Sequence, residues 1–346
     1  MRRGSITAAV VLAALLAGPA FAQAQSKAPV SKEWARNFEG VWTNATLTTL
    51  ERPARYPQLV VPKEQADALE KSVAARKEAS NAPSDLSQGA FKDSNAGAGY
   101  NAFWIDNGDG LMRVRGEARS SFITSPADGK MPFRDRPTSH KLMIKDGAEY
   151  RSGKGTFEGP EDLPLRERCL IGHADSGGPV MLNALCNTNY SFFVTPGHFV
   201  MQLEMINDMR IAPIFASAAE ARASHRPAAI RPWLGDSVAW WEGDTLVTET
   251  RNVHPVQEGR TMTPVSPQGK VTERFTRISK DELLYQFTVE DPVHYTQAWS
   301  GEYSFKPAKG LIYEYACHEG NYAMPGILHG ARLDEAAAAK GGGGGN

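Results

Sequence analysis

The chain has 346 residues, of which 41% are apolar, and 38 basic residues against 39 acidic ones leave a net charge of −1. This balance excludes both the basic surface of a nucleic-acid-binding protein and the low-apolar, high-charge composition of a disordered chain. Three cysteines are too few for a disulfide-framework protein. The length suits one large β domain or two modest domains, and 32 glycines with 22 prolines indicate many turns.

The N-terminus is typical of an export signal. Arg2 and Arg3 precede an apolar run at residues 6–16, which is too short to span a bilayer. The Ala-Phe-Ala sequence at 20–22 fits a cleavage site, so we expect a signal peptide over residues 1–22. No later stretch approaches ~20 apolar residues, so we expect a periplasmic or secreted protein without membrane attachment after cleavage. An exported protein meets oxidising conditions in which disulfides persist.

After the signal peptide the sequence predicts one folded domain. Residues 23–37 are expected to form a flexible leader, and residues 38–332 a single β-rich domain. A first strand is predicted at 38–43. The charged, Ala-rich stretch 62–79 has apolar residues at helical spacing and predicts one surface helix. Residues 81–100 are rich in Ser, Gly, Asn and Asp and predict a long loop.

From residue 101, short apolar runs alternate with turn signals. Strands are expected at 112–114, 121–124, 192–194, 199–205, 239–242, 245–250, 272–278, 283–289, 299–305 and 311–315. The last six form three consecutive hairpins, and a Gly-x-Trp tripeptide at 40–42 is similar to the start of lipocalin-type barrels.

These features predict an all-β antiparallel meander, either a lipocalin-like barrel or a strongly curved sheet with one peripheral helix. The alternative is a two-sheet β-sandwich. Residues 333–346 are low-complexity and are expected to form a flexible tail.

One motif copies the nucleophile loop of trypsin-like proteases, namely the Asp-Ser-Gly-Gly-Pro sequence at 175–179. That chemistry needs a histidine base and a buried aspartate that orients it. No upstream segment has the sequence context of such a histidine. We therefore interpret the motif as a Gly-Pro turn and predict that Ser176 is not a nucleophile.

A second constellation lies at a predicted strand end and combines His318, Glu319, Asn321 and Tyr322. Histidine supplies acid–base chemistry near neutral pH, and a neighbouring carboxylate can orient it or act itself. The alternative is a buried hydrogen-bonded cluster that closes one end of a barrel.

Further candidates lie upstream. Glu204 follows an apolar strand, where a buried acid needs a partner, and Arg210 is the nearest basic residue. Trp233 and Asp236 could supply a stacking wall and a polar contact. A structural ion pair and an aromatic plug with a capping aspartate are the alternative interpretations.

Cofactor motifs are absent from the sequence. No two of the eight histidines show the short spacing of zinc sites, and neither a P-loop nor a G-x-G-x-x-G pattern occurs. We expect no cofactor, although a metal site assembled across strands stays open as an alternative.

Several motifs recur in a fixed order between residues 38 and 332. They are Tyr-Asn-Ala-Phe-Trp (100–104), Pro-Ala-Asp-Gly (126–129), Glu-Arg-Cys (167–169), Glu-Met-Ile-Asn-Asp-Met-Arg-Ile (204–211), Trp-Leu-Gly-Asp-Ser (233–237), Trp-Glu-Gly-Asp-Thr-Leu (241–246), Glu-Arg-Phe (273–275), Glu-Asp-Pro (290–292) and Tyr-Ala-Cys-His-Glu-Gly-Asn-Tyr (315–322). This ordered set resembles a family of exported hypothetical proteins from proteobacteria and acidobacteria.

The resemblance assigns no activity. It does imply a disulfide between Cys169 and Cys317 with Cys186 free, because family members carry cysteines that match only the first two. In those members the Asp-Ser-Gly-Gly arrangement is usually missing, which speaks further against a protease.

Two functions fit the sequence. The first is an exported enzyme of the lyase, isomerase or hydrolase class that acts on a small, partly apolar molecule by acid–base chemistry. Its candidate catalytic residues are His318, Glu319, Glu204 and Asp236, and its candidate substrate-binding residues are Arg210, Trp233, Asn321 and Tyr322. The second is a non-catalytic, lipocalin-like protein that binds a small molecule. Several ionisable groups in one pocket would favour the enzyme.

Overall fold

The computed structural model describes residues 34–80, 106, 108–136, 157–163, 165–172, 176–184, 186–258 and 261–341. The predicted signal peptide, most of the predicted leader and the predicted loop at 81–100 lie outside the described residues.

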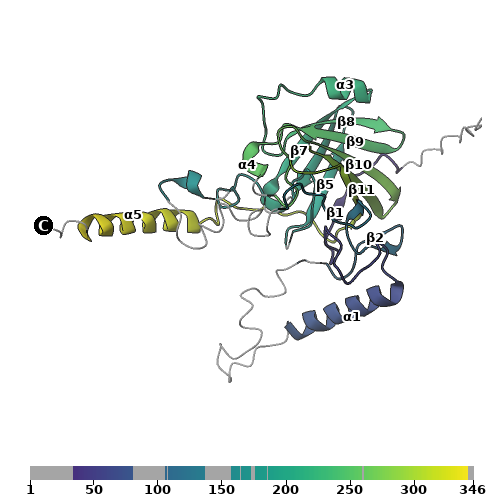
Figure 1. The fold of residues 1–346 in the computed structure, drawn as a ribbon, viewed down its shortest axis with the longest axis horizontal. Coiled ribbons are helices and arrows are strands. Elements are labelled where there is room, and N and C mark those ends of the chain that lie inside the picture. Colours follow the sequence, from purple (N-terminus) through teal and green to yellow (C-terminus); the bar gives the residue numbers. More distant parts are fainter. Residues whose placement is uncertain are drawn as a thin grey trace, which may run out of the picture. The chain divides into compact units, whose positions relative to one another are not determined.

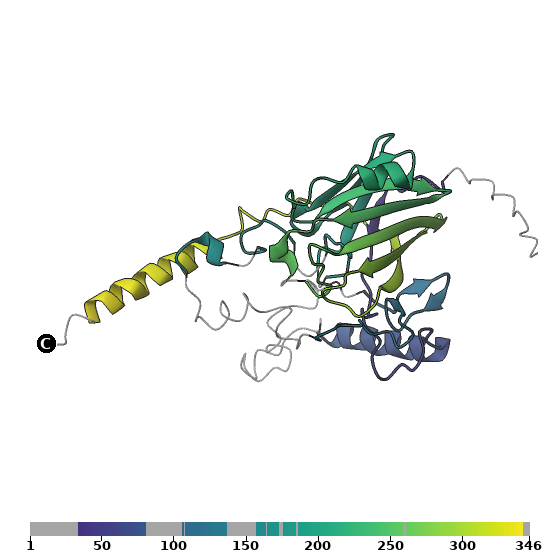
Figure 2. The same cartoon turned by 45° about the horizontal axis from the view of Figure 1, so that its top comes forward.

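Nine strands close into a barrel (Figures 1 and 2). They are β1 (Val41–Thr43), β5 (Asn189–Val194), β6 (His198–Leu203), β7 (Met209–Phe215), β8 (Asp236–Glu242), β9 (Thr245–Arg251), β10 (Lys270–Ser279), β11 (Glu282–Glu290) and β12 (Trp299–Pro307). Each strand pairs with the next in this order, and β12 pairs back with β1. This closure confirms the predicted all-β, lipocalin-like barrel; the alternative β-sandwich is wrong.

Local sequence signals account for several strands and hairpins of the barrel. In β6 the buried residues Phe199, Met201 and Leu203 alternate with more exposed ones, as a half-buried strand requires. Gly243, with a φ of +61°, makes the tight turn between β8 and β9, and β10 pairs with β11 over nearly its whole length. The hairpins predicted at 239–250 and 272–289 are therefore confirmed.

The predicted meander is wrong at one strand pair. β7 and β8 run parallel, with Ile214 opposite Ala239. A parallel pair needs a long return connection, and residues 216–235, which include helix α3 (Ala218–Ala223), provide it. The barrel is consequently mixed rather than wholly antiparallel.

Two further expectations fail near the C-terminus. Residues 311–315 form no strand, because β12 instead pairs with β11, β1 and the short β4 (Ile123–Ser125). The expected flexible tail begins inside helix α5 (Ala323–Gly341), whose alanine run has the highest intrinsic helix propensity.

The remaining elements lie outside the barrel wall. Helix α1 (Lys63–Ser80) confirms the predicted surface helix. Its Ala66 is buried in a small cluster with Leu111 and Ala118, at the hairpin of β2 (Arg113–Val114) and β3 (Glu117–Ala118). The other short elements are helix α4 (Pro255–Glu258) and the 3₁₀ turns η4 (Pro160–Asp162) and η5 (Met205–Asn207).

Aromatic side chains fill the barrel interior. Inward-facing rings pack edge to face or tilted against one another, for example Phe199 on Phe275 at 4.9 Å and Tyr285 on Tyr303 at 4.8 Å between ring centres. The same hydrophobic cluster includes Val180, which belongs to no strand. We call residues 176–184 the inner segment, because its side chains are buried among the barrel's core residues.

Candidate functional site

A buried ion pair lies inside the barrel. Arg210 on β7 donates two hydrogen bonds to Glu273 on β10, at 3.0 and 2.5 Å, and the two side chains are 2% and 0% exposed. Thr250 and Ser237 accept further hydrogen bonds from Arg210, and Tyr285 donates to Glu273 at 2.8 Å. Burial lowers the pKa of Arg210, but Glu273 outweighs it and holds the guanidinium charged. The pair therefore serves the barrel interior and has no access to a solvent-borne ligand.

The inner segment is held by tyrosine hydroxyls. Tyr303 donates to the Met181 carbonyl at 2.9 Å, and the Met181 N–H donates to the Tyr285 hydroxyl at 3.1 Å. Tyr190 donates to the carbonyl of Ser176 at 3.1 Å, and burial raises its pKa well above the ordinary value. Because the chain itself occupies these polar groups, the space that a lipocalin-type ligand would use is taken by the inner segment.

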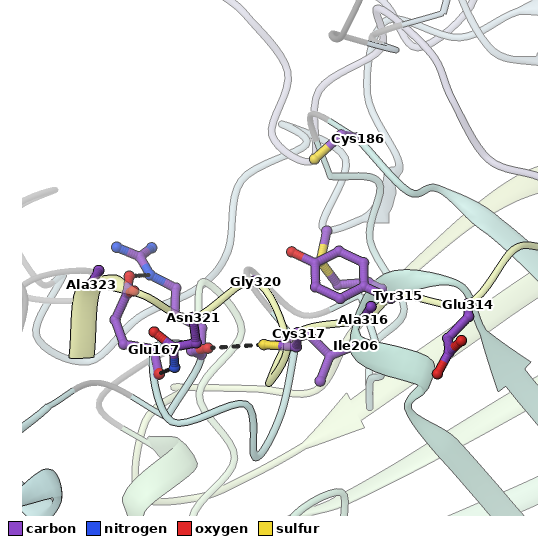
Figure 3. A pocket seen from close by; sticks show the side chains of 12 residues that line it. Glu167, Cys186, Ile206, Glu314, Tyr315, Ala316, Cys317, Gly320, Asn321 and Ala323 are labelled. Atoms are coloured by element: carbon purple, nitrogen blue, oxygen red, sulfur yellow. Dashed lines mark hydrogen bonds and ion pairs between the residues drawn. The ribbon is translucent and has the colours of Figure 1, made fainter. Parts of the chain in front are cut away.

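A cleft of about 660 Å³ lies outside the barrel beside the disulfide (Figure 3). Its walls come from two parts of the chain. One wall belongs to the barrel and its loops, and the other to residues 308–341, which we call the C-terminal arm. The lining residues are Arg166, Glu167, Cys186, Met205 and Ile206 on the first wall and Glu314, Tyr315, Ala316, Cys317, Gly320, Asn321 and Ala323 on the second.

The cleft combines aromatic, apolar and polar groups. In Figure 3 the carboxylate of Glu314 points away from the ring of Tyr315. Arg166 and Glu167 form an ion pair at 3.1 Å. Burial, assisted by the charge of Glu204, raises the pKa of the Cys186 thiol. The thiol is therefore protonated at neutral pH and is a poor nucleophile.

The backbone around the cleft is strained. Among the described residues other than glycine, six have a positive φ, and four of these are Cys169, Asn187, Ile206 and Asn207. Ile206 lines the cleft directly at φ +54°. A β-branched residue in this region is an outlier that costs on the order of 1–3 kcal/mol and is retained where the surroundings demand it, commonly at ligand sites.

The predicted disulfide is confirmed. Cys169 and Cys317 are bonded, with Cα atoms 5.8 Å apart, and Cys186 is free and half-buried. The sulfur of Cys317 lies 4.0 Å from the carbonyl oxygen of Arg166, and Asn321 donates to the carbonyl of Glu167 at 2.6 Å. The bond thus joins the two walls of the cleft.

The predicted catalytic carboxylates are engaged elsewhere. The carboxylate of Glu204 accepts from the Asn189 amide at 2.8 Å. Asp236 lies 2.8 Å from His225 Nδ1 and also accepts from the Arg226 N–H. Burial raises the pKa of Asp236, but these hydrogen bonds outweigh it and hold the pKa below the ordinary value. Both acids therefore act as local structural acceptors.

The other predicted residues divide between exposed and structural positions. His318, Glu319 and Tyr322 are exposed and do not line the cleft, although Asn321 does. Trp233 stacks on His254, with ring centres 4.1 Å apart. Within the described residues, no hydrogen bond or ion pair joins two of His318, Glu319, Glu204 and Asp236, and none of the four lines the cleft.

The buried Ser176 and the half-buried Asp208 both lie close to Gly172, near η5. The Ser176 hydroxyl is buried without a hydrogen-bond partner among the described residues. Asp208 accepts from the Gly172 N–H at 2.7 Å, and burial raises its pKa to about 6, partly offset by that hydrogen bond. A Cβ at Gly172 would meet both side-chain oxygens within 2.9 Å, so only glycine fits this position.

Several cleft residues were missed by the sequence reasoning. Arg166 precedes the Glu-Arg-Cys motif, and Tyr315 opens the Tyr-Ala-Cys-His motif, so each borders a recognised signal. Cys186 and Ile206 reach the cleft only through the folded loop geometry. The signal that could have found the site was the disulfide itself, because it brings the 165–172 loop to the C-terminal arm.

No family model, curated protein or solved structure matches this chain. In the described part of the chain, no helix is both long and apolar enough to cross a membrane. The described residues also contain no group of three or more His, Cys, Asp or Glu placed to hold a metal ion.

Proposed function

We propose that the protein is an exported, non-catalytic binding protein that holds a small, partly apolar organic molecule in the cleft beside the disulfide. The cleft volume carries this proposal, because about 660 Å³ lies within the range of small-molecule sites. The lining supports it, since the Tyr315 ring and Met205 offer apolar contact while Arg166, Glu167 and Asn321 offer polar contact.

The strained backbone supports the same location. Ile206 and the adjoining Asn207 have left-handed backbone conformations at the cleft wall. Backbone strain of this kind lowers stability and is retained mainly at functional sites. The barrel then acts as a rigid support for an external site. Export to the periplasm or beyond agrees with the disulfide, which persists in oxidising compartments. Membership of the exported family that the motifs resemble is part of this proposal.

A catalytic alternative rests on Asp208. Its pKa of about 6 suits a general acid or base near neutral pH, and it follows η5, which lines the cleft. Binding is favoured because Asp208 does not line the cleft and already accepts the Gly172 N–H.

Footprinting of Cys186 tests the binding proposal, since this is the one free thiol in the sequence. The probe is N-phenyl-1-naphthylamine, a partly apolar aromatic amine. Bound probe should slow alkylation of Cys186 by iodoacetamide, followed by mass spectrometry. Tyr315→Ala should weaken probe binding about tenfold, because an aromatic wall is lost.

Tyr322→Ala is the matched control, because Tyr322 is 84% exposed and does not line the cleft. Native mass spectrometry of protein purified from the periplasm adds a second readout for a retained molecule. Equal alkylation with and without probe, together with no retained molecule, would contradict the proposal.

A further inference from the structure

The cleft exists only while the C-terminal arm lies against the barrel loops. Five of its described lining residues lie between residues 166 and 206, and the rest lie between 314 and 323. No strand pairing joins the two walls, because the arm leaves the sheet at Pro307, the last residue of β12. The interactions that hold the arm against the barrel loops therefore also keep the cleft formed.

The disulfide joins two residues that lie far apart in the sequence. The disulfide connects residues 148 positions apart and places Cys317 directly in the cleft wall. Both cysteines are half-buried, so the bond is not sealed in the hydrophobic core.

Several of the hydrogen bonds that tie the arm to the rest of the protein are solvent-exposed. Asn207 exchanges two long hydrogen bonds with the backbone of Tyr315, at 3.3 and 3.4 Å. Asn321 donates to the Glu167 carbonyl, and Arg332 donates to the carbonyls of Phe157 and Glu158. Exposed hydrogen bonds of this kind compete with water and give little net stability.

The barrel, by contrast, is held together by contacts other than the disulfide. β12 pairs with β1 through Trp42 and Thr43, and the interior is held by aromatic packing and the Arg210–Glu273 pair. None of these contacts involves Cys169 or Cys317.

We propose that the Cys169–Cys317 disulfide is a redox latch, whose reduction by a small thiol or a protein dithiol frees the C-terminal arm and dismantles the cleft. Its effect on ligand binding rests on the proposed function, whereas release of the arm does not.

Reduction of the disulfide needs only a thiol reductant and proceeds by thiol–disulfide exchange. A reductant thiolate attacks one cysteine sulfur, the Cys169–Cys317 bond breaks, and a mixed disulfide forms. A second reductant thiolate then releases the remaining cysteine thiol. The cysteine pair gains two electrons and two protons, and the reductant is oxidised to its own disulfide. Cys186 takes no part, because its raised pKa keeps it protonated.

The test compares alkylation of Cys186 in two proteins where it is the sole free thiol, the oxidised wild type and Cys169→Ser/Cys317→Ser. Loss of the latch should speed iodoacetamide labelling at least about tenfold, as local opening exposes a half-buried group. Limited proteolysis should then cut within residues 308–322 of the variant only. Arg332→Ala, which removes noncovalent ties and keeps the disulfide, is the matched control and should label at the wild-type rate.

Wild-type protein treated with dithiothreitol provides a second measurement, with circular dichroism reporting on the barrel. Unchanged labelling and proteolysis in the variant would overturn the latch. Loss of the barrel signal in both the variant and the reduced wild type would also overturn it, because the bond would then hold the barrel. Protection of Cys186 by N-phenyl-1-naphthylamine is read separately in oxidised protein. Its absence there contradicts the proposed function and leaves the latch result standing.

Discussion

Glu273 and Arg210 are charged side chains that are buried away from water, so each depends on the other for its stability. Breaking a buried pair leaves one charge uncompensated, which typically costs about 3–5 kcal/mol. We expect Glu273→Gln to lower the free energy of unfolding by that amount in urea denaturation. Glu290→Gln is the control, because the Lys270–Glu290 pair is 32% and 45% exposed and is worth about 0–1 kcal/mol. Similar losses in both variants would contradict this account.

From the raised pKa of Asp208 we expect the folding stability to fall as the pH rises. Its folded pKa of about 6 exceeds the ordinary 3.8, so the folded state holds its proton more tightly than the unfolded state. The associated stability is complete below about pH 4 and is lost as pH rises through about 6, amounting to up to about 3 kcal/mol. Asp208→Asn should remove this difference. Urea midpoints measured from pH 4 to 7.5 check it, and parallel profiles would disprove it.

Ser176 has a buried hydroxyl that gains no hydrogen bond among the described residues. Removing an unsatisfied polar group is neutral or stabilising, so Ser176→Ala should change stability by no more than about 1 kcal/mol, upward if at all. We also expect no labelling by a fluorophosphonate, because the hydroxyl is 2% exposed. A clear loss of stability or covalent labelling would show that the serine has a partner or a role.

At the scale of elements, the inner segment depends on three tyrosine hydroxyls. Tyr303→Phe would leave the buried Met181 carbonyl without its donor, at a cost of about 1–3 kcal/mol. Tyr313→Phe removes the same atom from a side chain that is 72% exposed and should have no measurable effect. Thermal and urea unfolding of the two variants gives the comparison, and equal stabilities would mean that the hydroxyl does not hold the segment.

Local signals predicted the elements that depend on near neighbours. The β8–β9 hairpin follows from Gly243, and α1 follows from its own periodicity. The parallel β7–β8 pair and the entry of the inner segment into the barrel depend on partners far away in the chain, which no local pattern encodes. The glycines at 341–345 suggested a flexible tail, yet the alanines before them extend α5.

The candidate site was predicted only in part, for the same reason. The polar residues around 318 did mark the right stretch, because Asn321 and Cys317 line the cleft. The sequence could not show that His318 is exposed or that Arg210 pairs with Glu273 inside the barrel. Side-chain direction at a loop depends on long-range packing, about which the local pattern of polar residues carries no information.

At the scale of the molecule, the closed barrel has no edge strand among its nine strands. An open sheet would let its terminal strand fray first. We expect the amides of Trp42 and Thr43 in β1 to exchange hydrogen about as slowly as those of Phe275 and Tyr285 at the centre of the wall. Hydrogen-exchange mass spectrometry reads these segments directly, and much faster exchange in β1 would show that the β1–β12 seam opens.

The β1–β12 seam also sets a condition on when the protein can mature. Trp42 pairs with Pro307, so one side of the first strand lacks its partner until residue 307 has been synthesised. Pairings between residues so distant form slowly, and the bare strand can meanwhile join another chain. We therefore expect the yield of folded protein to depend on how well chaperones keep the unpaired N-terminal strand away from other chains, and not on the stability of the finished barrel alone.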